Sequence, residues 1–250
     1  MIDISGLSHS IADTAILADV SVTIPPKGIT ALIGPNGAGK STLLSLMCRL
    51  MPIQKGRIRI DELEVGHCAS DVLARKLAIL PQRVHVSSRL SVSELVSFGR
   101  YPHSKGRLGK EDQVLIDHAI DVFELQTLAD RQIDTLSGGQ RQRAFLAMAF
   151  AQDTDYLLLD EPLNNLDIAA VRKLMKTLSD LSHHHDRTIV IVVHDINIAA
   201  RYADHLIALR DGRCVADGAP GAIITEDFMR QTYGTDAEVF ERNGRPVVLV

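Results

Sequence analysis

The feature that most constrains this chain is a glycine-rich run, GPNGAGKS, at residues 34–41. It follows a short apolar segment of strand length, Thr30–Ile33, and precedes an apolar segment predicted to be a helix, Thr42–Leu50. Strand, glycine loop and helix are the context in which the pattern G-x-x-x-x-G-K-[ST] binds phosphate. In a chain of this length the pattern arises by chance only about once in a hundred cases. The run therefore predicts an α/β fold with a phosphate-binding loop.

Each residue type in the run has a physical use. Glycines let the backbone N–H groups curl around phosphates, and the following helix offers its positive N-terminus. Lys40 is expected to reach the β- and γ-phosphates of a nucleotide, and the Ser41 hydroxyl to bind Mg²⁺. The predicted phosphate-binding residues are Gly34, Pro35, Asn36, Gly37, Ala38, Gly39, Lys40, Ser41 and Thr42.

Two carboxylates end a second apolar run, Tyr156–Leu159. Taken alone, Asp160 and Glu161 are equally compatible with an exposed strand terminus. Because a phosphate loop lies upstream, we expect Asp160 to bind Mg²⁺ and Glu161 to polarise the attacking water.

The run LSGGQ, residues 136–140, opens a predicted helix, Gln140–Ala151. Two glycines at a helix start are unfavourable unless a ligand must approach the backbone. We therefore expect a second phosphate-binding surface at Ser137, Gly138, Gly139 and Gln140.

The remaining pattern fits one α/β domain. The apolar content is 46% with 4% aromatic residues and no Trp, so the core must be aliphatic, which favours α/β over an aromatic-rich β-sandwich. Further strands are predicted at Ile2–Ile4, Val20–Ile24, Gly56–Asp61, Ala78–Leu80 and Thr188–Val193. Further helices are predicted at 71–76, 92–98, 112–125, 169–181 and 227–233, the last within a small tail from Asp211 that ends in two short strands.

Several functional classes are disfavoured. A net charge of -4 gives no general attraction to nucleic acid. The three cysteines are Cys48, Cys68 and Cys214. Their odd number and the absence of a CxxC spacing argue against both a disulfide framework and a zinc site. The run His183–His185 is expected to be a solvated turn, so no metal other than Mg²⁺ is predicted. The N-terminus has no signal-peptide pattern, and no apolar window reaches the 18 or so residues of a membrane span.

In order and spacing, GPNGAGKS, Gln82, LSGGQ, YLLLDE, NNLD at Asn164–Asp167 and His194 resemble the ATPase domains of ABC transporters. The resemblance covers nearly the whole chain. It implies an α/β P-loop NTPase fold with a RecA-like parallel-sheet core, an N-terminal antiparallel β subdomain and a helical subdomain. It also implies a single domain over 1–250, with the helical subdomain at about 83–152 and the core plus β subdomain at about 1–82 and 153–250.

The resemblance implies ATP and Mg²⁺ as cofactors and a head-to-tail homodimer, in which LSGGQ of one subunit closes over ATP held by the other. Gln82 would sense nucleotide and permease and be a Mg²⁺ ligand, and Asp167 would link the two sites. His194 would contact the γ-phosphate, although on residues alone it is more often an ordinary strand end. The family's adenine-stacking aromatic corresponds here to Ile11, with His9 two residues earlier, and this is a departure from the family pattern.

The segments Val92–Arg107 and Gly218–Gly234 resemble the subfamily that serves importers of iron chelates, haem and cobalamin. This implies an ATP-hydrolysing subunit that powers import of a siderophore-type iron chelate through a membrane permease supplied by a substrate-binding protein. The expected location is peripheral, at the cytoplasmic face of the inner membrane, with the permease docking after Gln82.

Other readings remain. The cargo could instead be haem or cobalamin. A soluble ABC ATPase acting on a non-membrane partner is an alternative of a different class. The sequence speaks against part of it, the chromosome type, because no long heptad insertion separates Ser41 from Leu136 and no basic patch is present. A non-hydrolysing nucleotide-binding regulator is disfavoured because Glu161 is intact.

Overall fold

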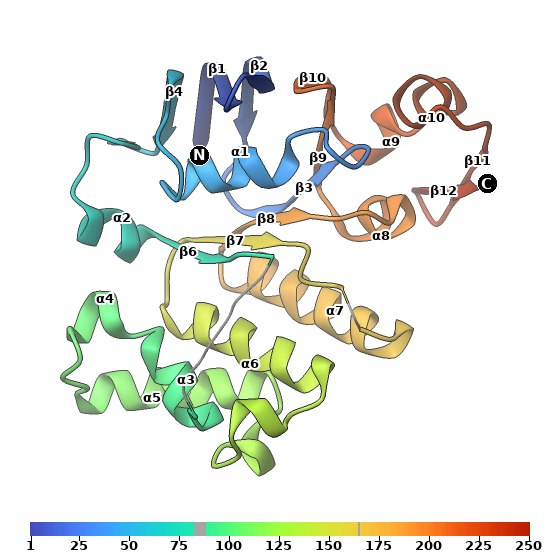
Figure 1. Ribbon diagram of the computed structural model, residues 1–250. Coiled ribbons are helices and arrows are strands. Elements are labelled where there is room, and N and C mark those ends of the chain that lie inside the picture. The colour runs from blue at the N-terminus through green and yellow to red at the C-terminus, as the bar shows by residue number, and fades with distance from the viewer. Residues whose placement is uncertain (83–88, 165) are drawn as a thin grey trace. The chain divides into compact units, whose positions relative to one another are not determined.

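The computed structural model describes residues 1–82, 89–164 and 166–250 (Figure 1). The chain forms two compact units, one of residues 1–68 and 178–250, the other of residues 69–177.

The first unit begins with an antiparallel sheet in the strand order β2-β1-β4-β5. Its strands are β1 (Ile2–Ile11), β2 (Thr14–Ile24), β4 (Lys55–Ile60) and β5 (Leu63–Glu64). Both β1 and β2 extend well beyond the predicted Ile2–Ile4 and Val20–Ile24. The apolar alternation in β1 is interrupted because the pairing of β1 with β2 shifts register after Ile4, next to Gly6 at φ 58°.

The parallel strands of the first unit carry the phosphate loop. Strand β3 (Gly28–Ile33) lies between β8 (Thr188–Val192) and β9 (His205–Arg210) and is parallel to both. Strand β10 (Arg213–Gly218) pairs antiparallel with β9. Every residue of β8 is buried, as expected for an apolar run inside a parallel sheet.

The helices of this unit follow the strands. Helix α1 (Lys40–Met47) follows β3, and α8 (Ile196–Tyr202) follows β8. Asp195 caps α8 by accepting hydrogen bonds from the N–H groups of Asn197 and Ile198, at 2.8 and 3.2 Å. Asp195 is thus the N-cap residue of α8, a position that favours Asp.

The tail of the first unit consists of α9 (Pro220–Ile223), α10 (Glu226–Tyr233) and a hairpin of β11 (Glu238–Arg242) and β12 (Arg245–Leu249). The predicted helix at 227–233 and the two short strands after it are confirmed. The hairpin turns through Asn243 and Gly244, both at positive φ (53° and 73°), as a two-residue I′ turn requires.

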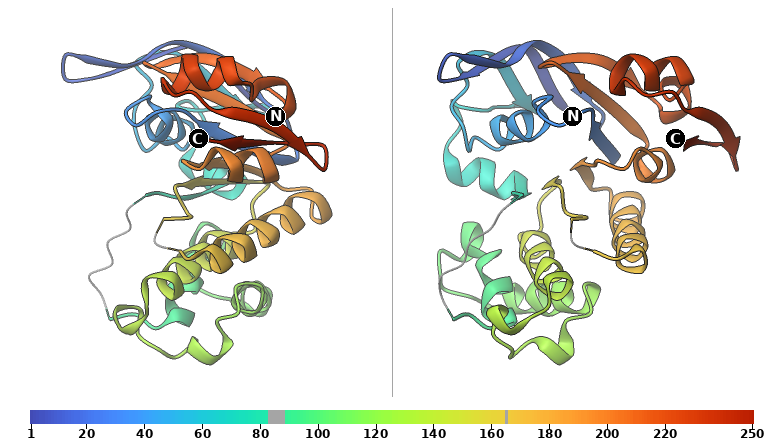
Figure 2. Two further views of the ribbon diagram at one scale, coloured as in Figure 1. Left: turned by 90° about the vertical axis from the view of Figure 1, so that its right-hand side faces the viewer. Right: turned by 45° about the vertical axis from the view of Figure 1, so that its right-hand side comes forward.

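The second unit holds the parallel pair β6 (Leu77–Leu80) and β7 (Tyr156–Asp160). Its helices are α2 (Ser70–Lys76), α3 (Val92–Phe98), α4 (Tyr101–Ser104), α5 (Lys110–Val122) and α6 (Gly138–Ala151), with short 3-10 turns at Gln126–Leu128 and Ile133–Thr135. Helix α7 (Ile168–His184) begins in this unit and continues into the other. The green helices of residues 92–122 lie beside α6 in the views of Figures 1 and 2.

A buried arginine fastens these helices together. Arg100 donates to Asp112 Oδ1 at 2.9 Å and to the carbonyls of Ala151 and Gln152 at 3.0 Å each, at the end of α6. The Gly109 N–H and then the Arg100 guanidinium hold the pKa of Asp112 below its usual value. The helical segment is therefore fixed by charge-assisted bonds as well as by apolar packing.

Candidate active site

The loop after β3 has the backbone conformation of a phosphate-binding loop. Gly34, Gly37 and Gly39 all have positive φ, at 134°, 79° and 98°. A Cβ on Gly34 would lie 1.9 Å from the carbonyl oxygen of Leu209, so no larger residue fits there. At this position glycine is required both for backbone conformation and for close packing.

Lys40 is drawn into this loop. Its ammonium donates to the carbonyl oxygens of Gly34 and Pro35 at 2.8 Å each, and the residue is only 5% exposed. Ser41 and Thr42 follow in the first turn of α1, so the loop, the ammonium and the helix N-terminus lie together. This arrangement suits a bound phosphate chain.

The tail reaches the same loop. The Tyr233 hydroxyl, at the end of α10, accepts a hydrogen bond from the Gly34 N–H, and burial raises the Tyr233 pKa to about 12. Nothing in the sequence indicated this contact, which joins residues far apart in the chain.

His194 is exposed and lies just beyond the end of β8. Strands β3 and β8 are parallel neighbours, with Leu32 paired to Val192 and the Val193 N–H donating to the Leu32 carbonyl at 3.2 Å. His194 and the phosphate loop therefore leave the same edge of the sheet, as ligand-binding residues of parallel sheets do.

In the second unit, the structure brings Glu161 together with Gln82. Strands β6 and β7 run parallel with Leu80 paired to Leu159, so the residues after them meet at one edge. The Gln82 amide donates to Glu161 Oε2 at 2.6 Å, and the Asn164 amide donates to the same oxygen at 2.7 Å.

The backbone at these carboxylates is also distinctive. Asp160 is 6% exposed at the end of β7, and Glu161 has a left-handed conformation (φ 51°), which is uncommon for a residue other than glycine. The holding role of Asn164 was missed by sequence reasoning. The sequence signal available was that Asn favours turns, and here the Asn164 N–H donates to the Glu161 carbonyl in such a turn, at 3.3 Å.

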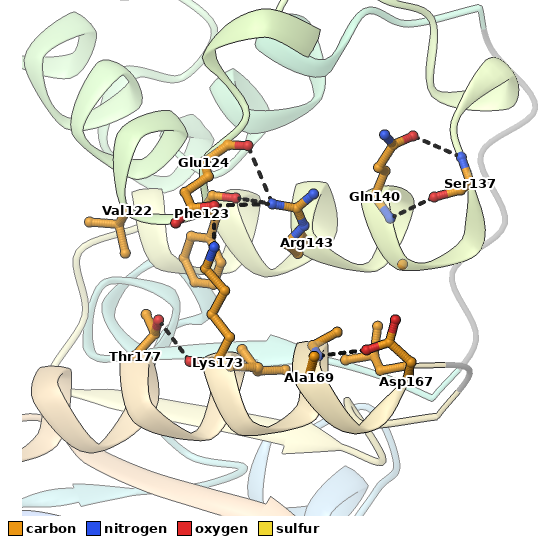
Figure 3. Close-up of a pocket in the computed structure, with 14 residues that line it drawn as sticks. Val122, Phe123, Glu124, Ser137, Gln140, Arg143, Asp167, Ala169, Lys173 and Thr177 are labelled. Atoms are coloured by element: carbon orange, nitrogen blue, oxygen red, sulfur yellow. Dashed lines mark hydrogen bonds and ion pairs between the residues drawn. The ribbon is translucent and has the colours of Figure 1, made fainter.

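The LSGGQ run forms the N-terminus of α6 and borders a cavity of about 470 Å³ (Figure 3). Ser137 caps the helix by accepting from the Gln140 N–H at 3.3 Å, while the Gln140 side chain accepts from the Ser137 N–H at 3.0 Å. Gly139 also lines this cavity, and a Cβ on Gly138 would meet nothing within 4 Å. The surface is thus open to an approaching ligand.

Asp167 lines the same cavity from the start of α7, where its carboxylate accepts from the Ala170 N–H at 2.8 Å. The predicted NNLD run includes residue 165, which lies outside the described residues, as do residues 83–88 of the segment predicted to dock a permease. The structure therefore brings LSGGQ and Asp167 together.

Ile11 ends β1 and is 50% exposed, whereas His9 is 3% exposed. The His9 ring therefore offers no open face on which adenine could stack, and Ile11 stays the candidate base contact.

The histidine run lies partly inside a helix. His183 and His184 form the last turn of α7, which ends three residues later than the predicted Leu181, and His183 Nε2 lies 3.4 Å from Asp204 Oδ2. Across the described parts of the chain no group of three or more His, Cys, Asp or Glu side chains has the arrangement of a metal site. The same residues contain no helix long and apolar enough to cross a membrane.

The predicted site residues thus fall in two groups. The first unit carries Ile11, the loop of residues 34–42 and His194, and the second carries the rest. The predicted Mg²⁺ ligands are divided in the same way, with Ser41 in the first unit and Gln82 and Asp160 in the second.

Comparison with known proteins agrees with this geometry. Residues 17–164 match the ABC transporter family model. The chain is 48% identical to the petrobactin import ATP-binding protein YclP of Bacillus subtilis (strain 168), over 93% of this chain and 92% of the relative. It is 43% identical to the ferric enterobactin transport ATP-binding protein FepC of Escherichia coli (strain K12), over 92% of this chain and 87% of the relative.

Among solved structures, the chain is similar to a dimeric ATP-binding cassette in a post-hydrolysis state bound to ADP and Pi. The TM-score is 0.78 at 26% identity, covering 88% of this chain and 98% of the other. The loop geometry, the paired carboxylates and these matches lead to one assignment: the chain belongs to the ABC transporter family, as an ATP-binding and ATP-hydrolysing subunit.

Proposed function

We propose that the protein powers the import of a siderophore-type iron chelate. The observation that carries this proposal is the 48% identity, along 93% of the chain, to a protein named for petrobactin import. The 43% identity to a ferric enterobactin transport protein supports the same class of cargo.

In this proposal the loop of residues 34–42 binds the phosphates of ATP, and Lys40 exchanges one of its bonds to the loop carbonyls for a phosphate oxygen. His194 contacts the γ-phosphate from the neighbouring strand end. Ile11 lies against the base.

The predicted Mg²⁺ ligands are the hydroxyl of Ser41, the carboxylate of Asp160 and the amide oxygen of Gln82. Each would donate through oxygen, the ligand atom that Mg²⁺ prefers. When bound, Mg²⁺ supplies neutralisation of the charge on the phosphates.

Glu161 polarises the attacking water. The amides of Gln82 and Asn164 fix its carboxylate through one oxygen, Oε2. Gln82 is suited to both of its predicted roles, because its nitrogen donates to Glu161 while its oxygen is the atom that a cation would use.

The assembly is a homodimer on a membrane permease, peripheral to the cytoplasmic face of the membrane, with a substrate-binding protein delivering the cargo. Ser137, Gly138, Gly139 and Gln140 of one copy contact the ATP of the other, and Asp167 links the two sites. The dimeric cassette to which this chain is similar supports that arrangement. The permease docks in the segment from Gln82 to Arg107.

The test is uptake of radioactive iron by cells that depend on this subunit, co-expressed with the permease and binding protein encoded beside it. Ferric petrobactin and ferric enterobactin are supplied separately, with haem and cobalamin as competing cargoes. Wild type and the exposed-surface control Glu62→Gln should import at least one ferric chelate, and Glu161→Gln should not.

Import of haem or cobalamin alone would overturn the cargo but leave the ATPase assignment in place. Iron uptake that continues with Glu161→Gln would instead show that this subunit does not power the importer. A protein that never co-purifies with the permease from membranes would favour a non-membrane partner.

A further inference from the structure

Three arginines surround a cavity of about 620 Å³ in the tail of the first unit. Arg201 comes from α8, and Arg242 and Arg245 come from the β11–β12 hairpin. The described residues that line the cavity include these three cations and no carboxylate. The full lining is Asn197, Arg201, Arg242, Asn243, Arg245, Pro246 and Val247.

The hairpin places two of these charges directly opposite each other. Arg242 pairs with Arg245 across the strands, on either side of the Asn243-Gly244 turn. Like charges in directly opposed positions destabilise a hairpin. The turn needs only Asn and Gly for its geometry, so the turn itself does not require an arginine on either side.

The frame of the cavity is rigid. Asn197 donates to the Val248 carbonyl at 2.9 Å and accepts from the Val248 N–H at 2.8 Å, which fastens the hairpin to α8. Arg245 donates to the carbonyl of Ala203, the residue after α8, at 2.6 Å. Both walls of the cavity are therefore held before any ligand arrives, which lowers the entropic cost of binding.

The charge in the cavity is only partly compensated. Arg245 forms a long ion pair, with its Nη2 at 3.9 Å from Asp204 Oδ1. The other oxygen of Asp204 accepts a hydrogen bond from the Ile29 N–H at 2.8 Å. Arg201 lies over the ring of Tyr202 at 5.5 Å. Arg242 forms no ion pair with any residue that the structure describes.

We propose that this cavity binds a small molecule carrying more than one phosphate group, at a site separate from the phosphate loop. Guanidinium groups match phosphate oxygens with paired N–H donors, and three arginines from α8 and the hairpin line this cavity. The volume lies within the range of small-molecule sites and exceeds what a single phosphate fills. The attraction is local, because the chain as a whole carries a net charge of -4.

The test uses inorganic pyrophosphate as the probe, with binding measured by calorimetry on the full-length protein at constant ionic strength. Because the phosphate loop also binds phosphates, every variant is made with and without Lys40→Ala. We expect a binding component that survives Lys40→Ala and weakens about tenfold to a hundredfold in Arg201→Gln and Arg242→Gln. Arg213→Gln, an exposed arginine on β10, is the matched control and should bind as wild type does.

ATP hydrolysis by Arg242→Gln should equal that of wild type, which shows that the variant is folded and that its phosphate loop is intact. The proposal is overturned if all pyrophosphate binding disappears with Lys40→Ala, or if Arg242→Gln and Arg213→Gln behave alike. Flotation with vesicles distinguishes the source of the phosphate. If the protein binds phosphatidic acid vesicles but not phosphatidylcholine vesicles, if this binding requires the arginines, and if free pyrophosphate does not bind, then the ligand is a membrane headgroup and not a soluble molecule.

Discussion

Asn164→Ala should reduce ATP hydrolysis without reducing ATP binding. The Asn164 amide donates to Glu161 Oε2 at 2.7 Å, and the Gln82 amide donates to the same oxygen at 2.6 Å. The substitution removes one donor and leaves the Glu161 carboxylate in place. The orientation of the carboxylate is then less fixed, although its chemistry is unchanged.

The size of the effect follows from the bond that is lost. A hydrogen bond to a charged group contributes about 1.5 to 3 kcal/mol, which corresponds to about 10- to 150-fold in rate if all of it orients the carboxylate. Because these groups are partly exposed, we expect the lower end, about tenfold in kcat. Glu161→Gln removes the base itself and should cost about 10² to 10⁴-fold.

The assay is steady-state phosphate release by the permease-bound protein, with nucleotide affinity measured separately. Gln113→Ala is the matched control, because Gln113 makes the same kind of amide-to-carboxylate bond, to Asp117 at 2.9 Å, on the exposed surface of α5. If Asn164 acts through Glu161, adding Asn164→Ala to Glu161→Gln should produce no further loss. Additive losses in the double variant would refute the reasoning.

Three further predictions concern the dimer, the base and the tail. Ser137→Arg should keep ATP binding but lose hydrolysis, measured as phosphate release. Mixing this variant with Lys40→Ala should restore at most one composite site per dimer. Full activity in a strictly monomeric sample would contradict this prediction. Ile11→Tyr should tighten ATP binding by on the order of 1 to 3 kcal/mol. Wild type should bind ATP and GTP with similar affinity in direct titrations. A strong preference of wild type for ATP that Ile11→Tyr leaves unchanged would show that adenine contacts another residue. Because the folded-state pKa of Tyr233 is raised to about 12, its contribution to stability is complete below the ordinary tyrosine value and is lost as pH rises towards 12. The free energy of unfolding, measured with denaturant, should therefore fall more steeply above about pH 10 in wild type than in Tyr233→Phe. The same pH dependence in both proteins would argue against the burial of this hydroxyl.

Features that depend on neighbouring residues were predictable from sequence. The phosphate loop is one, because its glycines, lysine and flanking strand and helix form one continuous segment. Helix α3, predicted at 92–98, spans those residues, and its start is set by the reciprocal capping box of Ser91 and Glu94. Strand β9 was not predicted, although its apolar run Leu206–Leu209 is as long as the run Tyr156–Leu159 that was.

Contacts between distant segments were not predictable. Gln82 and Glu161 are 79 residues apart, and their hydrogen bond depends on the pairing of Leu80 with Leu159 in parallel strands. Sequence reasoning placed Glu161 in the site from its position at a strand end and Gln82 from the family resemblance, but it gave no reason for them to touch. The burial of His9 likewise depends on irregular pairing between β1 and β2, which shifts register on both sides of that residue.

The tail from Asp211 was predicted to be a small appendix, yet its contacts make it part of the frame of the site. Through Tyr233 it binds the N–H of Gly34, the first residue of the phosphate loop. Through Val248 it is fastened to Asn197 in α8, the helix that Asp195 caps directly after His194. The first residue of the phosphate loop and the helix that follows His194 therefore both contact the same short stretch of chain. Since a displacement of about 1 Å at a reacting group is enough to cost catalysis, we expect the tail to support hydrolysis by holding the loop and the strand end in place, although none of its residues belongs to a nucleotide-binding motif.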